Sequence, residues 1–436
     1  MNSEWKAKTL KRVGALKGGS GFPLDEQGFS VDEMELPFYK VKDLATPKYL
    51  RETDNYVSYE TAQKLGASIF RAGTIVFAKV GAALLLNRFR QLFCDGCIDN
   101  NMMALELEQT HSKDFFLHLL NTLDLSQNFN QGPVPSVNTR QIGEIKVVVP
   151  PLVDQNLIAA YLDASCDVLN TALAAKRRQL QMLDELRKDV IQQVVTRGLD
   201  QQPELRKTGN AWMEEVSLGW DLVCLKRVSE LQGGLTLGKT YSGPLVERPY
   251  LRVANVQDGH LDLNDVTLIE VPAEVAKRVE LRVDDVLMTE GGDLDKLARG
   301  FLWNGEIPNC LHQNHIFAVR CFHHKLLPKF LTYLTASRYG RDYFEATGKK
   351  TTNLASTNAT KVGAFPLPLP SVHEQARLVE YLEDQLESLR TLQNNLQTQI
   401  STLLAYRKSL IHECVTGQRR ITEGDVTLGK TLISPK

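Results

Sequence analysis

The sequence predicts an α+β protein. Two duplicated α/β domains are separated by two long helices that pair as an antiparallel coiled coil, and a pseudo-two-fold relation links the two halves. Three observations lead to this fold class. The chain repeats itself, each repeat ends in a long heptad pattern, and short β-type runs bounded by turn residues occupy the remainder.

The overall composition is that of a folded globular protein. The 436 residues are 43% hydrophobic and 24% charged, which excludes a largely disordered chain. The net charge of −1 excludes a uniformly basic nucleic-acid coat, although a local basic face remains compatible with it. The seven Cys suit free thiols in a reducing compartment. Because we find neither a signal peptide nor an uninterrupted apolar span, we expect a cytoplasmic protein without a membrane segment.

The duplication is clearest where each repeat begins. Trp5 and Trp220 are each followed five residues later by the tetrapeptide Leu-Lys-Arg-Val, at 10–13 and at 225–228, and then by a pair of Gly. All these matches share one offset, which is not expected by chance. Further along the chain the offset drifts, as insertions in loops would produce.

The repeats divide the chain into domains, helices and connections. The predicted domains cover 1–150 and 219–370, the predicted spacer helices cover 151–200 and 371–418, and a linker and a tail cover 201–218 and 419–436.

Both domains have the pattern of mixed α/β structure. The β-type runs at 74–77, 146–149 and 316–319 are bounded by Gly, Asn, Asp or Pro, which favour turns. The segments 115–123 and 328–337 have the pattern of short helices.

The spacer helices are predicted from their heptads. The second begins with a capping box at 371–374 and carries Leu at every d position, and the first follows the same frame. An apolar a/d seam has to be buried on another helix, so we expect the two helices to pair over on the order of 65 Å. The length of the pattern argues against two ordinary helices within one globule. The seam residues expected to pair are Leu162, Leu169, Leu183, Val190, Leu382, Leu389, Leu396, Leu403 and Leu410.

Several motifs suggest chemistry that their context does not support. The runs 233–240 and 424–431 match the P-loop expression, but Gly243 and Pro244 would break a helix after the first, and only five residues follow the second. The C-x-x-C at 94–97 contains Asp-Gly, which favours a turn, and we expect no metal site. No signature of a nuclease or methyltransferase centre is present, so a catalytic chain is disfavoured.

Polar, basic and Gly-rich loops at corresponding places in the two repeats are candidates for DNA binding. Arg and Asn can read base edges by bidentate hydrogen bonds, and Lys and backbone N–H groups can hold phosphates. The alternative for any one loop is an ordinary solvated surface. The candidate DNA-binding residues are Lys79, Arg88, Arg90, Asn138, Arg140, Lys296, Arg299, Arg338, Arg341, Lys349, Lys350 and Asn353.

This order of features resembles the specificity subunit of type I restriction–modification systems. The resemblance covers nearly the whole chain and depends on the duplication together with the motifs at the helix ends. Pro-containing segments precede both helices, at 150–155 and 369–375, and both helices finish in Val-Thr followed closely by Gly, at 194–198 and 414–417.

The resemblance implies two target-recognition domains, each reading one half of a bipartite DNA site. The helices would set the gap between the half-sites and dock two methyltransferase subunits, which restriction (motor–nuclease) subunits would join. It also implies that this chain is not an enzyme and binds no cofactor. Adenine methylation with S-adenosylmethionine and DNA cleavage with ATP and Mg would belong to the partner subunits.

Two other classes of function remain as alternatives at this stage. A bivalent protein-binding scaffold, with two α/β modules on a coiled coil, would need no basic faces and no DNA. A self-sufficient nuclease or methyltransferase is disfavoured because the catalytic signatures are missing.

Overall fold

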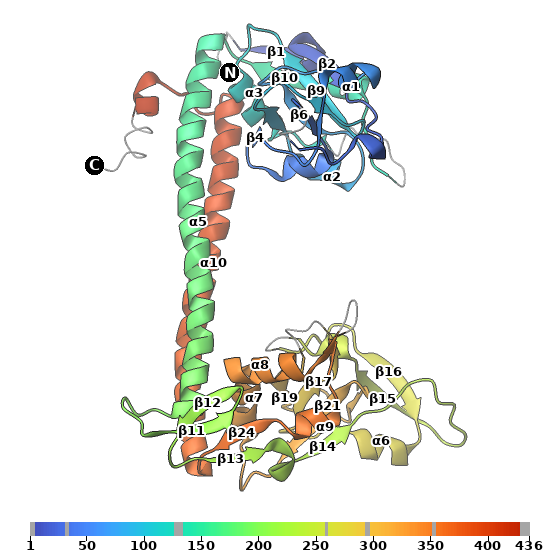
Figure 1. The fold of residues 1–436 in the computed structure, drawn as a ribbon, viewed down its shortest axis with the longest axis vertical. Helices are drawn as coiled ribbons and strands as arrows, with labels where there is room; N and C mark the ends of the chain where they lie inside the picture. The colour runs from blue at the N-terminus through green and yellow to red at the C-terminus, as the bar shows by residue number, and fades with distance from the viewer. Residues whose placement is uncertain are drawn as a thin grey trace. The chain divides into compact units, whose positions relative to one another are not determined.

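The chain folds into two compact units (Figure 1), in a computed structural model. Unit 1 comprises residues up to Arg177 and those from Thr398 onward, and unit 2 comprises Arg178–Gln397. The structure describes residues 5–30, 35–125, 134–257, 260–292, 297–350 and 355–427.

A five-stranded sheet forms the centre of unit 1. Its strand order is β2 (Gly14–Gly18), β9 (Met102–Leu107), β6 (Ile75–Ala78), β7 (Arg90–Leu92) and β4 (Tyr49–Leu50). β9 lies between β2 and β6 and is antiparallel to both. All four side chains of β6 are buried, as expected for a central strand with both faces covered.

Smaller elements surround this sheet. A second sheet has the order β5 (Tyr56–Val57), β3 (Leu36–Tyr39) and β8 (Cys97–Ile98), and β1 (Lys6–Thr9) pairs with β10 (Lys146–Val149). The helices are α1 (Tyr59–Lys64), α2 (Ala82–Leu85), α3 (Lys113–Leu120) and α4 (Thr139–Gly143).

The main sheet of unit 2 repeats this order. It runs β14 (Ser229–Gly233), β21 (Ile316–Cys321), β17 (Val286–Thr289) and β19 (Gly300–Leu302). These strands correspond by sequence position to β2, β9, β6 and β7 of unit 1. The duplication read from the sequence is therefore a duplication of topology, and the predicted α+β fold class is confirmed.

The remaining strands of unit 2 also follow unit 1 in part. One sheet has the order β16 (Thr267–Val271), β15 (Val246–Leu251) and β20 (Leu311–His312), and it corresponds to the β5–β3–β8 sheet of unit 1. In addition, β13 (Asp221–Cys224) pairs with β24 (Pro366–Leu369). The short strands β18 (Gly291–Gly292), β23 (Ala355–Ser356) and β22 (Lys349–Lys350) form another sheet.

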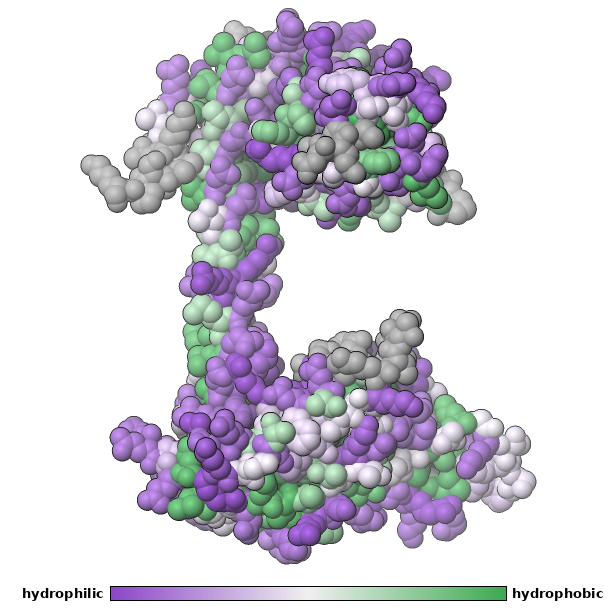
Figure 2. Space-filling view, viewed as in Figure 1, coloured by the Kyte–Doolittle hydropathy of each residue, from purple (hydrophilic) through white to green (hydrophobic). Residues whose placement is uncertain are grey.

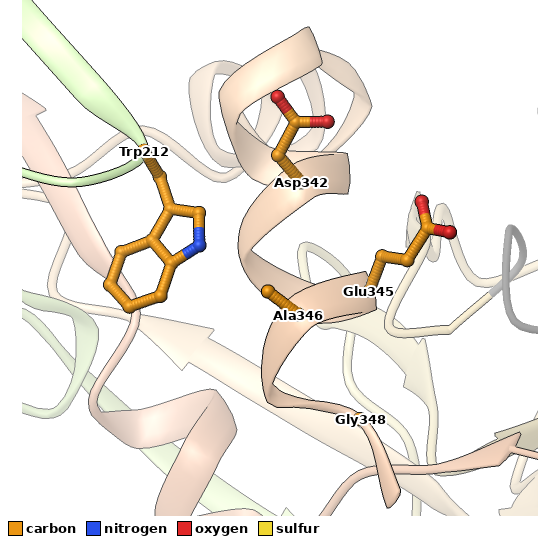
Figure 3. A pocket seen from close by; sticks show the side chains of 5 residues that line it. All are labelled: Trp212, Asp342, Glu345, Ala346 and Gly348. Atoms are coloured by element: carbon orange, nitrogen blue, oxygen red, sulfur yellow. The ribbon is translucent and has the colours of Figure 1, made fainter. Parts of the chain in front are cut away.

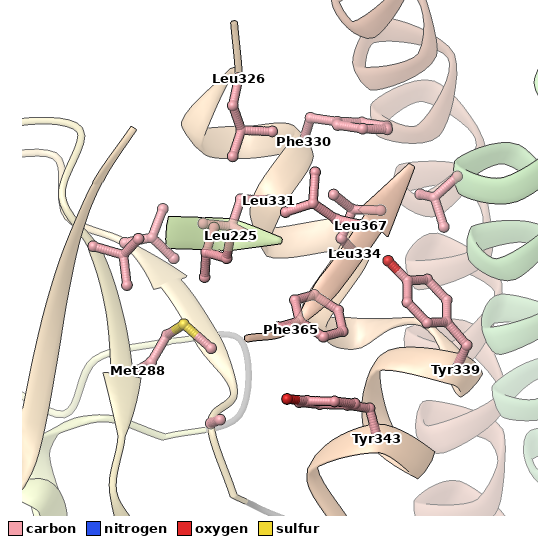
Figure 4. Packing of buried hydrophobic residues seen from close by; sticks show 14 of the residues in the cluster. Leu225, Met288, Leu326, Phe330, Leu331, Leu334, Tyr339, Tyr343, Phe365 and Leu367 are labelled. Atoms are coloured by element: carbon pink, nitrogen blue, oxygen red, sulfur yellow. The ribbon is translucent and has the colours of Figure 1, made fainter. Parts of the chain in front are cut away.

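Four short helices complete unit 2: α6 (Ala273–Val279), α7 (Pro328–Ala336), α8 (Arg338–Thr347) and α9 (Ala359–Gly363). Tyr339 and Tyr343 of α8 pack against Phe365 with ring centroids 5.5 and 5.2 Å apart. This aromatic group joins Leu residues of α7 and Met288 of β17 in the core (Figure 4).

Two long helices, α5 (Leu152–Arg197) and α10 (Val372–Val415), contribute to both units. In unit 1 the first part of α5 packs with the last part of α10, and Arg407 Nη1 donates to Asn170 Oδ1 at 3.0 Å. In unit 2 the last part of α5 packs with the first part of α10. The helices therefore run antiparallel within each unit.

The nine seam residues all lie on the covered side of their helices. Leu162, Leu382 and Leu410 are at most 2% exposed, and the other six are buried or half-buried. Residues of the opposite side, such as Met182 and Leu392, are 63% and 51% exposed. By length and hydropathy α5 also contains a stretch that could cross a membrane, but the apolar residues of its seam pack against protein.

A buried Gln attaches each long helix to its domain. Gln155 is 1% exposed, accepts from Ser112 N at 2.8 Å and donates to Pro150 O at 2.8 Å. Gln375 has no exposed surface, accepts from Leu327 N at 2.8 Å, and donates to Lys325 O and Pro370 O. The Gln that follows Pro in both repeats therefore connects the start of the long helix to the start of a short helix of the domain, α3 in unit 1 and α7 in unit 2.

The segment 201–218, expected to be a linker, contains a β-hairpin. Strand β11 (Leu205–Asn210) pairs with β12 (Met213–Ser217), and Gly209, at φ 69°, lies in β11 where the pairing register shifts. Met213 and Val216 are buried in the core of unit 2. The hairpin was missed because its alternating apolar residues are few, whereas their burial depends on the domain beneath them.

Candidate nucleic-acid interface

Two loops that are far apart in sequence lie side by side in unit 1. The backbone N–H of Val137 donates to Lys79 O at 2.9 Å, and the N–H of Gly81 donates to Pro135 O at 2.8 Å. The loop after β6 thus adjoins the segment that leads into α4. We call residues 79–81 together with 134–140 the loop pair of unit 1.

The same arrangement recurs in unit 2. The N–H of Thr357 donates to Glu290 O at 2.7 Å, and the two segments continue as paired strands β18 and β23. Strand β22 extends this sheet on the other side of β23. Residues 290–292, 349–350 and 355–358 form the loop pair of unit 2, at the positions that match unit 1 in the repeat.

Three of the predicted cations of unit 1 are available to a ligand. Lys79 and Arg88 are half-buried and Arg140 is exposed, and none of them makes an ion pair among the residues that the structure describes. Lys79 and Arg140 belong to the loop pair, whereas Arg88 follows α2. The three side chains are therefore free to contact phosphates or base edges.

Two other predicted residues of unit 1 already have structural roles. Arg90 donates from Nη1 to Phe89 O at 2.7 Å and from Nε to Thr46 O. Burial, together with the neighbouring charge of Arg88, lowers the pKa of Arg90 to about 10. Asn138 caps α4, because its Oδ1 accepts from Gln141 N at 2.9 Å. The sequence Ser-x-Asn occurs at corresponding places in the two repeats, at 136–138 and at 356–358, and Asn358 caps α9 in the same way.

The predicted residues of unit 2 divide similarly. Arg338 forms ion pairs with Glu185 and Asp189 of α5 at 2.9 and 3.0 Å. Arg341 donates to Leu297 O at 2.6 Å, and Arg299 has an interaction within the protein. Lys349 on β22 is exposed and without an ion pair in the part of the chain that the structure describes.

Three predicted residues are placed only partly or not at all. Lys296 and Asn353 lie outside the described residues, and Lys350 is described only through its backbone pairing with Ala355.

Two cavities of unit 2 are lined by residues of opposite charge. A cavity of about 580 Å³ lies between Trp212 of the β-hairpin and helix α8, which contributes Asp342 and Glu345 (Figure 3). Its carboxylates disfavour a phosphate ligand. A second cavity of about 320 Å³ is lined by Lys239 and Arg278 over apolar residues.

The first P-loop match and the C-x-x-C motif both lie in surroundings that can be compared with a phosphate site and a metal site. The run 233–240 begins at the end of β14, and the next regular element is strand β15, so no helix follows to hold a phosphate. Cys97 is buried, and burial raises the pKa of its thiol to about 12. Within the described ranges, no three His, Cys, Asp or Glu residues gather as metal ligands would.

A comparison with protein families matches residues 2–181 to the type I restriction modification DNA specificity domain. The Escherichia coli (strain K12) type I restriction enzyme EcoKI specificity subunit is 23% identical over 63% of this chain. The Salmonella potsdam StySPI specificity subunit is 22% identical over 72% of it. The matches span 58% and 66% of those relatives' own lengths.

A comparison of folds extends the likeness to nearly the whole chain. A solved structure from work on complex assembly and conformational transition of the type I R-M system matches with a TM-score of 0.69 and 14% sequence identity. The match covers 96% of this chain and 99% of the other. At this identity, the likeness shows a shared fold.

Proposed function

We propose that this chain is a specificity subunit of a type I restriction–modification complex and selects the DNA sequence on which that complex acts, as the match of residues 2–181 to the type I restriction modification DNA specificity domain supports. Each unit reads one half of a bipartite double-stranded site. The observation that carries this proposal is the loop pair, which recurs at matching positions of both units and presents Lys79 and Arg140 in one and Lys349 in the other. Two similar readers suit two half-sites.

The long helices are proposed to set the gap between the half-sites and to dock two methyltransferase subunits. Large apolar side chains on their uncovered sides support docking, because such residues mark protein interfaces. Met182, Leu392 and Tyr406 are 63%, 51% and 51% exposed, and the view in Figure 2 has apolar residues among the polar ones along these helices. Restriction subunits would then join the methyltransferase complex.

The chain is proposed to have no catalytic activity and no cofactor of its own. Methyl transfer from S-adenosylmethionine to adenine, and DNA cleavage driven by ATP with Mg, are assigned to the partner subunits. The net charge of −1 is compatible with a complex in which partner subunits supply part of the phosphate contacts. We propose a cytoplasmic location for this chain, because the DNA that it would bind is in the same compartment.

Methylome sequencing of cells with and without this gene tests the proposal. We expect one bipartite methylated motif to disappear when the gene is deleted and to return on complementation. The purified chain mixed with its methyltransferase subunits should methylate a duplex carrying that motif, and neither component should do so alone. An unchanged methylome on deletion would refute the proposed function.

A further inference from the structure

Two adjacent leucines of unit 1 are largely exposed. Leu85 and Leu86, at the end of α2, are 58% and 56% exposed. Leu84, immediately before them, is 2% exposed and packs in the core of unit 1. Val134, in the neighbouring loop, is also 56% exposed. Leu85 and Leu86 make an apolar tip at the surface, at the end of the helix that directly follows residues 79–81 of the loop pair.

The tip is held in place from both sides. On one side, Gly81 N donates to Pro135 O at 2.8 Å, and Leu84 N donates to Gly81 O at 3.1 Å. On the other side, the side-chain amide of Asn87 donates to Leu123 O, and Phe89 N donates to Asn121 Oδ1 at 3.2 Å. Exposed side chains on an anchored turn lose little conformational freedom on binding, which favours a role in contact with a ligand.

The charge around the tip indicates what it contacts. The segment 71–94 contains four Lys or Arg and no Asp or Glu. Lys79 precedes α2 and Arg88 follows it, and neither side chain is paired within the described part of the chain. An apolar tip between unpaired cations complements a polyanion with an apolar interior, which is the character of stacked DNA.

We infer that Leu85 and Leu86 form a wedge that inserts between base pairs of the half-site read by unit 1, while Lys79 and Arg88 hold the flanking phosphates. This inference rests on the proposed function. DNA-binding proteins use Leu and other apolar side chains in this way, unstacking one step and kinking the duplex. The wedge would make recognition by unit 1 sensitive to the deformability of that step.

Among the described residues of unit 2, the segment after β17 has no counterpart of the wedge. In unit 2 the chain after β17 continues into Glu290 and strand β18, where Gly291 and Gly292 pair with β23. Among the described residues between Val286 and Cys310, no large apolar side chain is exposed. We therefore expect the wedge to distort the half-site of unit 1.

The test compares the wild-type chain with L85A/L86A, each assembled with its methyltransferase subunits, on a duplex carrying the motif found by methylome sequencing. The matched control is L24A, because Leu24 is 86% exposed in the same unit but lies beside Asp25 and Glu26. We measure affinity over a range of salt concentrations and the end-to-end distance of the duplex by fluorescence energy transfer.

We expect L85A/L86A to bind about tenfold more weakly and to lose the shortening of the duplex, with the salt slope unchanged. In contrast, R88A should reduce the salt slope by about one. L24A should behave as wild type, and L85M/L86M should retain the kink because Met keeps the apolar volume.

Unchanged affinity and unchanged duplex length in L85A/L86A would overturn the wedge. Normal DNA binding with loss of methyltransferase assembly on size-exclusion chromatography would also overturn it, and would assign the tip to a protein partner. If wild type itself did not prefer the motif over a scrambled duplex, the proposed function would fail first. The two failures are therefore distinguishable.

Discussion

At the scale of the residue, the Gln near the start of each long helix is buried and hydrogen-bonded. Gln375 satisfies one backbone N–H and two backbone carbonyls in a site without water access. We expect Gln375→Ala to lower the free energy of unfolding by about 3 kcal/mol, because buried polar groups would lose their partners. Urea unfolding measures this change. Gln385→Ala, at an exposed position of the same helix, is the control and should change stability little.

The two Trp that begin the repeats differ in one hydrogen bond. Trp220 Nε1 donates to Glu374 Oε1 at 3.0 Å, whereas Trp5 Nε1 is buried without a partner, and the residue that matches Glu374 is Asp154. Asp154→Glu is expected to supply the longer acceptor and raise stability by about 1 kcal/mol. Glu374→Asp should lower stability similarly. Thermal unfolding of both variants decides the matter, and equal shifts of the same sign would contradict it.

His312 is expected to make unit 2 sensitive to acid. Its side chain has no exposed surface, its Nδ1 lies 2.9 Å from Ile316 O, and burial lowers its pKa to about 4. In the unfolded chain His312 takes up a proton below its ordinary pKa of about 6.5. In the folded chain it stays neutral until a lower pH. Stability should therefore fall by about 3 kcal/mol as the pH drops from 6.5 to 4.

His312→Asn keeps a donor for Ile316 and removes this titration. The difference in unfolding free energy between wild type and the variant, measured across that pH range, isolates the contribution of His312 from the carboxylates. A difference that does not vary with pH would show that His312 is not the cause.

At the scale of the element, the long helices are the parts that link sequence pattern to function. Each supplies residues to both cores, and the contacts divide near 177 in α5 and 397 in α10. Seven residues inserted at both places keep the seam in phase, because the heptad repeats every seven residues. The insertion lengthens each helix by about 10 Å.

We expect this double insertion to widen the gap in the recognised motif by about three base pairs and to leave both half-sites unchanged. Methylome sequencing reads both quantities at once. Altered half-sites with an unchanged gap would contradict the spacer role of the helices.

At the scale of the whole molecule, each long helix ends against the Trp that begins one of the two repeats. Gly198, at φ 81°, ends α5 against the ring of Trp220, and Gly417, at φ 77°, ends α10 against the ring of Trp5. A side chain at Gly417 would meet Trp5 Cζ3 at 3.0 Å. Each unit thus combines one domain with the start of one long helix and the end of the other.

In the proposed function each unit reads its own half-site, so damage to one loop pair should affect one half-site. K79A/R140A is expected to weaken DNA binding about tenfold and to relax the half-site of unit 1 only. K349A should relax the other half-site. Methylome sequencing of each variant distinguishes them, and relaxation of both halves by either variant would contradict independent reading.

Local sequence patterns were sufficient to predict the long helices, the duplication and several strands. The heptad Leu residues, the capping box at 371–374 and the matching Trp and Leu-Lys-Arg-Val segments predicted the helices and the duplication, because helix formation and repetition depend on residues that are neighbours in sequence. The strands at 146–149 and 316–319 were predicted for the same reason and are part of β10 and β21.

The residues of the candidate interface could be identified only from the tertiary structure. From sequence, Arg90, Arg338 and Lys79 are equivalent cations, but folding brings Arg90 to backbone carbonyls and Arg338 to the carboxylates of α5, and leaves Lys79 unpaired. Likewise, Leu84 and Leu85 look alike, yet one is buried and the other exposed. The sequence by itself determined the repeats and the helices through short-range preferences. Only the tertiary structure decided which of the candidate side chains remain unpaired, because that depends on partners distant in the chain.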